Sequence, residues 1–225
     1  MRTIAHRGAS GYAPENTAAA FDLAIGMRAD AIETDVQLTA DGYLVLVHDT
    51  AIDRTSNGSG PVADHTLADL RSLDFGSWFG KEFAGQRIVT LEEALTTWLD
   101  RIPFALEIKD PRAALPMMEQ IPETPRIEIT SFHWDALMEA RERNSAYRFG
   151  YLTSQFDAAM IRQCGEAGLQ QICPHADTVT REMVDLAHTS GLEVRAWGVS
   201  RREQIHILLD SGADGTTCNW PDWIS

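Results

Sequence analysis

The chain alternates short runs of β-forming residues with stretches of helical periodicity along almost its whole length. From residue 104 onward, each strand and the helix after it take roughly 20 to 25 residues. Such a rhythm is typical of a parallel sheet, because each helix returns the chain to the edge where the next strand starts. The predicted strands are 3–6, 31–36, 43–48, 104–108, 127–131, 148–152, 171–173, 193–197 and 214–217, and the predicted helices are 17–27, 91–99, 113–120, 134–143, 156–167, 181–189 and 201–210.

One of these runs, 43–48, does not fit the parallel pattern. It follows the run 31–36 across a short polar segment that contains Asp41-Gly42, a pair typical of hairpin turns. Without it the chain has eight strands, and eight βα units in 225 residues match a small (β/α)8 TIM barrel. A doubly wound open sheet is the alternative, although no GxGxxG motif opens the first unit as dinucleotide binding would require.

Residues 49–87 interrupt the rhythm with a stretch rich in Gly, Ser, Asp and Pro. We expect a single domain over 1–225, with 49–87 as a small insertion after the second strand. Insertions of this length in compact domains are often lids or binding loops. Its aromatic residues Phe75, Trp78 and Phe79 could line a pocket or simply pack the insertion onto the barrel.

The charge balance excludes several classes of partner. With 19 Lys and Arg against 33 Asp and Glu, the formal net charge is −14. This charge repels nucleic acid and anionic membranes, so we expect neither a nucleic-acid partner nor stable membrane association. To bind a phosphorylated small molecule, the protein would need local positive charge that reverses its negative electrostatic field. A bound metal cation is the obvious source of that charge.

Three features that the sequence lacks bear on the cellular compartment of the protein. The N-terminus has no hydrophobic signal core, no apolar run approaches the ~20 residues that span a bilayer, and the cysteines form no CxxC pair. Cys164, Cys173 and Cys218 are an odd, widely spaced set, as expected for free thiols in a reducing compartment. These features indicate a cytoplasmic protein.

Polar side chains end several of the predicted strands, where catalytic residues of a parallel barrel lie. Glu33 and Asp35 are two residues apart, so they project from one face of a strand, about 6.6 Å apart. Glu107 and Lys109 repeat this spacing on the next parallel strand. Three carboxylates favour a hard cation, Mg²⁺ or Ca²⁺. The alternative is that these four residues form structural salt bridges at the barrel rim.

Two histidines, His6 and His48, also lie at predicted strand ends. One imidazole could protonate a leaving group while the other takes a proton from a nucleophile. Lys109 is one of only two lysines in a chain with 17 arginines. Its position two residues after Glu107 is therefore unlike that of an ordinary solvated surface lysine. A primary ammonium suits a phosphate oxygen.

These residues belong to a longer series of motifs that resembles the glycerophosphodiester phosphodiesterase family. The resemblance spans nearly the whole chain, and the order of the motifs makes it specific, although any one motif alone would be weak. The motifs are His6-Arg7-Gly8, Pro14-Glu15-Asn16-Thr17, Glu33-Thr34-Asp35-Val36, Asp41-Gly42, His48-Asp49, Asp53-Arg54-Thr55, Thr90-Leu91-Glu92-Glu93-Ala94, Glu107-Ile108-Lys109, Ser131-Phe132, Ala196-Trp197-Gly198-Val199, Gly212-Ala213-Asp214-Gly215 and Pro221-Asp222.

The resemblance implies a TIM barrel that hydrolyses glycerophosphodiesters to sn-glycerol 3-phosphate and an alcohol. It implies that His6 and His48 are the acid–base pair. It also implies that Glu33, Asp35 and Glu107 bind one divalent cation, Mg²⁺ or Ca²⁺. The nucleophile is left open between water and the glycerol 2-hydroxyl of the substrate, which would pass through a cyclic phosphate.

The same resemblance assigns the substrate contacts. It implies that Arg7 and Lys109 bind phosphate, that Glu15 contacts or supports the substrate, and that Trp197 lines the glycerol or phosphate pocket. The chain departs from the family near its end, where Asn219 stands in place of a common aspartate. We expect this change to touch neither the metal ligands nor the two histidines, and no role is assigned to it.

Three other functions remain open. The enzyme could act on a lysolipid, as a lysophospholipase D-type phosphodiesterase. The chain could be a non-catalytic barrel that binds a phosphodiester, although the intact set of histidines, carboxylates and Lys109 argues against this. A sugar-phosphate isomerase on the same fold would need a Gly-rich phosphate loop, for which Gly198 and Gly215 are faint signals. The oligomeric state is not predicted.

Overall fold

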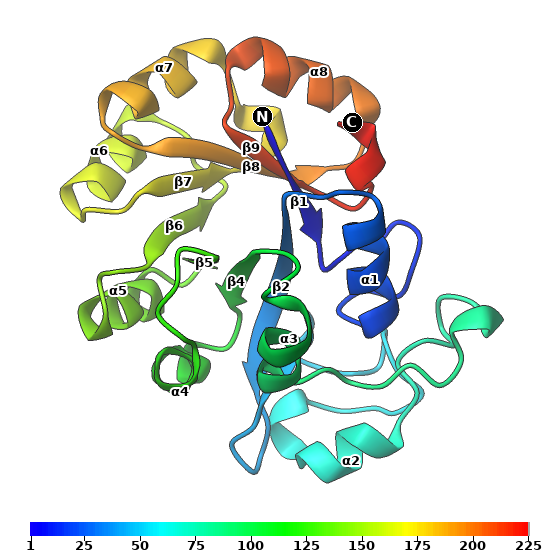
Figure 1. Cartoon of the computed structure of the whole chain (residues 1–225). Coiled ribbons are helices and arrows are strands. Elements are labelled where there is room, and N and C mark those ends of the chain that lie inside the picture. Colours follow the sequence, from blue (N-terminus) through cyan, green and yellow to red (C-terminus); the bar gives the residue numbers. More distant parts are fainter. Residues whose placement is uncertain (225) are drawn as a thin grey trace.

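Eight parallel strands close into a barrel within residues 1–224, the part of the chain that the computed structural model describes (Figure 1). The first strand of the barrel pairs with both the second and the last, which closes the ring and rules out the open doubly wound sheet. The predicted (β/α)8 TIM barrel is therefore confirmed. The barrel strands are β1 (Arg2–His6), β2 (Ala31–Leu38), β4 (Phe104–Ile108), β5 (Ile127–Ser131), β6 (Arg148–Thr153), β7 (Gln171–Pro174), β8 (Glu193–Val199) and β9 (Gly215–Cys218).

Helices surround this barrel as an outer layer, and the main apolar core lies between the two (Figure 1). The helices predicted to start at residues 17 and 156 begin one and two residues later, because Thr17 and Asp157 cap them. The Oγ1 of Thr17 accepts from the backbone N–H of Ala20. Gly168 and Gly191 follow helix ends with φ of +69° and +77°, as their positions predict. The helices are α1 (Ala18–Gly26), α2 (Leu67–Ser72), α3 (Leu91–Trp98), α4 (Ala114–Gln120), α5 (Trp134–Arg143), α6 (Ala158–Glu166), α7 (Arg181–Thr189) and α8 (Arg202–Ser211), with 3-10 turns η1 (Val62–Asp64), η2 (Lys81–Phe83), η3 (Pro111–Ala113), η4 (Ala176–Thr178) and η5 (Pro221–Trp223).

The run predicted as a hairpin extension is the short strand β3 (Leu44–Leu46), which pairs antiparallel with β2. The turn between them contains Gly42 at φ +84°, a conformation that glycine adopts without strain. β3 ends earlier than the predicted 43–48. His48 therefore lies in the loop after the strand, where its ring reaches the barrel mouth.

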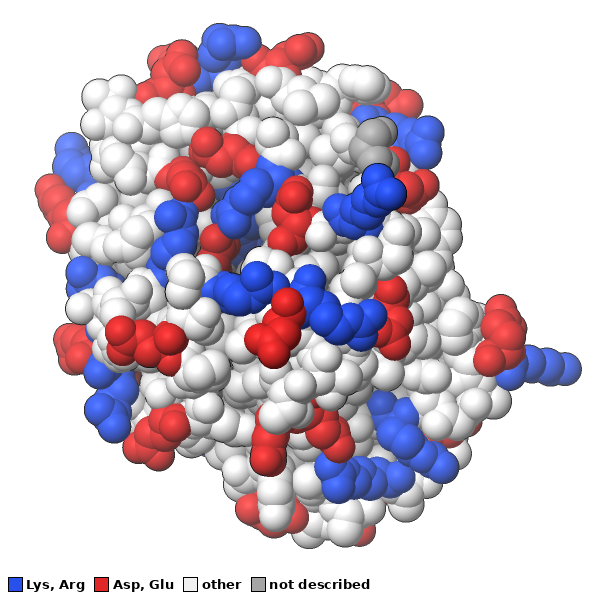
Figure 2. All heavy atoms as spheres, in the orientation of Figure 1, with Lys and Arg blue, Asp and Glu red and all other residues white. Residues whose placement is uncertain are grey.

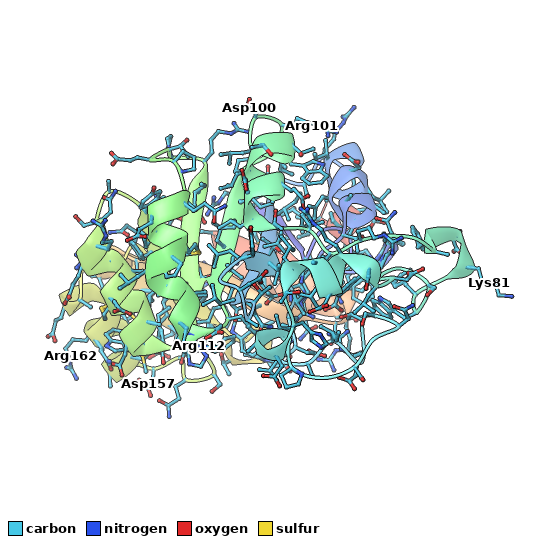
Figure 3. All side chains as sticks on the ribbon, turned by 90° about the horizontal axis from the view of Figure 1, so that it is seen from below. Lys81, Asp100, Arg101, Arg112, Asp157 and Arg162 are labelled. Atoms are coloured by element: carbon cyan, nitrogen blue, oxygen red, sulfur yellow. The ribbon has the colours of Figure 1, made fainter. Side chains whose placement is uncertain are left out.

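Residues 49–87 extend from one side of the barrel and carry η1, α2 and η2 (Figure 1). They form a small apolar cluster of their own with β3, in which Phe75 is buried. Trp78 and Phe79 contact each other edge to face at 5.5 Å. Lys81 lies at the far tip of this segment and points away from the barrel (Figure 3). The aromatic residues thus pack the insertion, and they are absent from the lining of the pocket described below.

On the face drawn in Figure 2, basic and acidic side chains are interleaved, and neither sign forms a broad continuous patch. No helix of residues 1–224 is long and apolar enough to cross a membrane. Cys164, Cys173 and Cys218 are free and buried, in agreement with the expectation of unpaired thiols.

Candidate active site

Three carboxylates converge inside the barrel mouth. Glu33 and Asp35 come from β2, Glu107 comes from β4, and Asp35 and Glu107 lie opposite each other in the strand pairing. Each is buried, and one oxygen from each lies within 4.8 Å of the others. The strand spacing predicted that Glu33 and Asp35 share a face, and the structure agrees.

The electrostatics of these carboxylates are those of a crowded anionic site. Burial and the neighbouring Asp35 raise the pKa of Glu33 well above its ordinary value. The same causes raise the pKa of Glu107 to about 7. Burial alone would raise the pKa of Asp35 too, but Arg7, His48 and Lys109 hold it below its ordinary value. The cluster therefore needs additional positive charge to hold all three carboxylates ionised.

The nearest cations supply part of that charge. Lys109 Nζ lies 2.8 Å from Glu107 and 3.6 Å from Asp35, and Arg7 Nε lies 3.2 Å from Asp35. The salt bridges that we considered as an alternative are thus present, but even with these cations and the charge of Arg195 nearby, the pKa values of Glu33 and Glu107 stay raised. Asp35 Oδ1 is buried without a hydrogen-bond partner in the described chain. An all-oxygen set with a buried oxygen that accepts no hydrogen bond fits a hard divalent cation.

The turn after β1 brings Arg7 and Glu15 to the same site. Arg7 has φ +57°, a conformation that side-chain-bearing residues rarely adopt and that is concentrated at functional sites. Gly8 follows at φ +82°, and a Cβ there would lie 2.6 Å from the backbone of Ala20 in α1. This close approach folds the loop back, so that Arg7 Nη1 donates to Glu15 Oε1 at 2.8 Å.

His6 has a partner that the sequence did not predict. Its Nδ1 lies 2.5 Å from Oδ1 of Asn219, just past β9. The expectation that Asn219 would touch neither histidine is therefore wrong: β9 pairs with β1, and this pairing brings Asn219 beside His6. His6 keeps 32% of its side chain exposed, but that surface opens into the pocket. Burial, helped by Arg7, lowers the pKa of His6 to about 4.

His48 differs from His6 in its partner. Its Nδ1 lies 2.7 Å from Oδ1 of Asp49, a carboxylate. Arg54 of the insertion donates to Asp49 at 2.6 Å and to both oxygens of Glu15 at 2.7 and 2.8 Å. Arg54 thus joins the loop after β1 to the loop after β3. Burial lowers the pKa of His48, and the nearby Asp35 opposes that effect.

A pocket of about 190 Å³ opens between these groups. Trp197 of β8 lines this pocket and contacts Phe132 edge to face at 5.1 Å. Lys109 Nζ lies 5.7 Å from the ring of Phe132. The pocket lining brings together seven predicted site residues with residues that were not assigned a role, and it consists of His6, Arg7, Glu33, His48, Glu107, Lys109, Thr130, Phe132, Leu152, Arg195, Trp197, Gly198 and Thr217.

Known proteins resemble this chain along nearly its whole length. The sequence model of the glycerophosphoryl diester phosphodiesterase family matches residues 6–223. The chain belongs to this family. It is 38% identical over 236 residues to the "Putative glycerophosphodiester phosphodiesterase YhdW" of Bacillus subtilis (strain 168), covering 100% of this chain and 96% of that protein. It is 32% identical to a glycerophosphodiester phosphodiesterase of the same organism, covering 98% of this chain and 84% of that protein.

Solved structures of this family share the fold. A phosphodiesterase of Oleispira antarctica, solved in complex with the product sn-glycerol-3-phosphate, matches with a TM-score of 0.91 and 28% identity. The match covers 100% of this chain and 95% of that one. A glycerophosphodiester phosphodiesterase of Agrobacterium tumefaciens matches with a TM-score of 0.87 and 26% identity, over 100% and 98% of the two chains.

Proposed function

We propose that the protein hydrolyses glycerophosphodiesters to sn-glycerol 3-phosphate and an alcohol, by acid–base catalysis beside a divalent cation. The observation that carries the proposal is the arrangement of two histidines around a buried trio of carboxylates at the mouth of the barrel. Family membership and the product held by the Oleispira antarctica relative support the choice of substrate.

The charged groups match a phosphodiester. Arg7 and Lys109 line the pocket and would neutralise the phosphate oxygens, on which negative charge grows during the reaction. Glu33, Asp35 and Glu107 would hold the cation. When bound, a divalent cation polarises a phosphoryl oxygen as a Lewis acid. We take the cation to be Mg²⁺ or Ca²⁺, because its ligands are all carboxylates.

The two histidines divide the proton transfers. His6 donates its Nδ1–H to the amide oxygen of Asn219, so its Nε2 lone pair faces the pocket and accepts the proton of the nucleophile. His48 is paired with Asp49, which stabilises the cationic ring, so we assign it the proton that the departing alkoxide takes up. The nucleophile is water or the substrate's own 2-hydroxyl. Isolation of a cyclic phosphate would identify the second.

We further propose that residues 49–87 are an insertion within a single domain of residues 1–225, and that it closes one side of the active site. The support is Arg54, which bridges Asp49 and Glu15. In the same proposal the protein is cytoplasmic, and its partners are small-molecule phosphodiesters.

Substrate release assays test this function. Purified protein is incubated with glycerophosphocholine, glycerophosphoethanolamine and lysophosphatidylcholine. The released alcohol, choline or ethanolamine, is measured for all three substrates, and sn-glycerol 3-phosphate is measured for the two water-soluble diesters. Release from the two water-soluble diesters, faster than cleavage of the lysolipid, is the expected result. Faster cleavage of the lysolipid would replace our proposal with the lysophospholipase D-type activity. No cleavage of any substrate with either cation would favour a binding-only barrel.

A further inference from the structure

Arg195 is a buried cation that the reaction described above does not use. It lies on β8 two residues before Trp197, so its side chain points into the barrel about 6.6 Å deeper. It is 2% exposed and lines the pocket. Its Nη1 donates to Thr217 Oγ1 at 2.6 Å. The thiol of Cys173 interacts with the guanidinium group. The Nε and Nη2 atoms of Arg195, which are neighbouring donors on one edge of that group, make no hydrogen bond to an oxygen or nitrogen atom of the described residues.

Thr130 is a second unpaired polar group in the same pocket. It lies on β5, its side chain is fully buried, and its Oγ1 has no partner within residues 1–224. Buried polar atoms are nearly always hydrogen-bonded in folded proteins. Arg195 and Thr130 therefore point to an oxygen-bearing group that occupies the deep end of the pocket.

The charges near Arg195 and Thr130 determine which oxygen-bearing group can bind at the deep end of the pocket. Glu33 and Glu107 line the same pocket, and Glu128 lies close enough to Arg195 to be influenced by its charge. An oxyanion at the deep end would face these carboxylates. A hydroxyl group fits better, because it accepts from the guanidinium and donates to a carboxylate or to Thr130.

The residues at the mouth and at the deep end of the pocket indicate how the substrate is oriented in it. Arg7 and Lys109 lie just past the carboxyl ends of β1 and β4, so the phosphate would bind near the mouth. The alcohol that varies between substrates must then point outward, and the constant half must point inward. We propose that Arg195 and Thr130 bind a hydroxyl of this inner half and select a polyol phosphate over a hydroxyl-free one. This inference rests on the proposed function.

Calorimetric binding of two monophosphates tests the inference. sn-Glycerol 3-phosphate and n-propyl phosphate differ only in two hydroxyl groups, and both are titrated in the presence of the cation that supports turnover. We expect the wild-type protein to prefer the glycerol compound by about 10-fold or more. Arg195→Met and Thr130→Val should each reduce this preference to a few-fold or less, mainly by weakening the glycerol compound.

Controls separate this binding role from a structural one. Thr216→Val removes another buried hydroxyl, which donates to Ala196 O on the outer side of the barrel wall, and should leave the preference intact. If Arg195→Met does not fold, as judged by its thermal transition, Thr130→Val carries the test. A preference retained in the folded variants overturns this inference and leaves the proposed function standing. A wild-type protein that binds both monophosphates equally also overturns this inference, whereas the proposed function fails only if no diester is cleaved in the release assay.

Discussion

The ring of His6 is held by the side chain of Asn219, with 2.5 Å between Nδ1 and Oδ1. The other catalytic candidate, His48, is held instead by the carboxylate of Asp49 at 2.7 Å. A neutral amide fixes the tautomer of a histidine without adding charge, whereas a carboxylate also stabilises the protonated ring. This difference between their partners is the reason that we propose different proton transfers for the two histidines, although they lie in the same pocket.

Asn219 predicts a specific tautomer of His6. In the wild-type protein the proton of neutral His6 should reside on Nδ1, which is visible in the ¹⁵N chemical shifts of labelled histidine. Asn219→Ala should populate the other tautomer and lower kcat more than it raises KM. Asn219→Asp should restore the Nδ1–H form, because a carboxylate accepts the same bond. An Nε2–H tautomer in the wild-type protein would show that the amide is turned the other way.

Removal of either histidine should abolish most of the turnover. We expect His6→Ala and His48→Ala each to lower kcat by about 10²- to 10⁴-fold, the usual contribution of a positioned acid or base. Thermal unfolding should stay close to that of the wild type, since both rings are partly exposed in the pocket. His206→Ala, at an exposed position of α8, is the matched control. A variant of His6 or His48 with the rate of this control would refute the assignment.

Arg54 is expected to act on catalysis more than on stability. It joins Asp49 to Glu15, and its side chain is 44% exposed. Arg54→Ala should lower kcat/KM by about 10- to 100-fold, because Asp49 then no longer holds His48 in place. The free energy of unfolding should change by less than about 1 kcal/mol.

The control for Arg54 is Arg71→Ala, which breaks the exposed ion pair at 2.6 Å between Arg71 of the insertion and Glu93 of α3. Both variants lose an exposed arginine together with its ion pairs, two for Arg54 and one for Arg71, but only Arg54 reaches the loops of the pocket. Equal kcat/KM for the two variants would show that the bridge has no part in the reaction.

Stabilisation by the cation should increase with pH. In the cation-free protein the pKa of Glu107 is about 7, above its ordinary value of 4.5. Between these values the folded chain retains a proton that the unfolded chain has released, so the free energy of unfolding falls as pH rises. A bound cation replaces that proton. The rise in melting temperature on adding Mg²⁺ or Ca²⁺ should therefore be larger at pH 8 than at pH 5.

Glu107→Gln tests the origin of this trend. The substitution removes a charge that titrates in the relevant range, so both the cation affinity and its pH dependence should decrease. Calorimetric titration of the cation at several pH values measures both. Unchanged affinity in this variant would exclude Glu107 as a ligand.

The fold and the carboxylates could be predicted because they are encoded locally. Alternation of strands and helices within a few tens of residues is visible in the sequence, and a spacing of two residues places Glu33 and Asp35 on one face. The Asp41-Gly42 turn is equally local. Some helices begin a residue or two later than the sequence pattern predicts, where a side chain such as Thr17 caps the first turn.

The contacts that the sequence did not predict are long-range. Asn219 meets His6 across 213 residues, through the pairing that closes the barrel, and no local pattern contains that information. Arg54 reaches Glu15 across 39 residues from an insertion without regular periodicity. Arg195 stands between Val194 and Ala196 in an apolar strand. Arg195 lies two residues before Trp197 on the same strand, and this spacing is a signal in the sequence that both side chains face the pocket.

Turnover of glycerophosphocholine before and after removal of metal tests the central claim most directly. The protein is stripped with a chelator, loss of metal is verified by elemental analysis, and Mg²⁺ or Ca²⁺ is then added back. We predict that release of sn-glycerol 3-phosphate stops on stripping and returns with one of these ions. Release that continues in protein shown to be free of metal would contradict the cation-dependent mechanism.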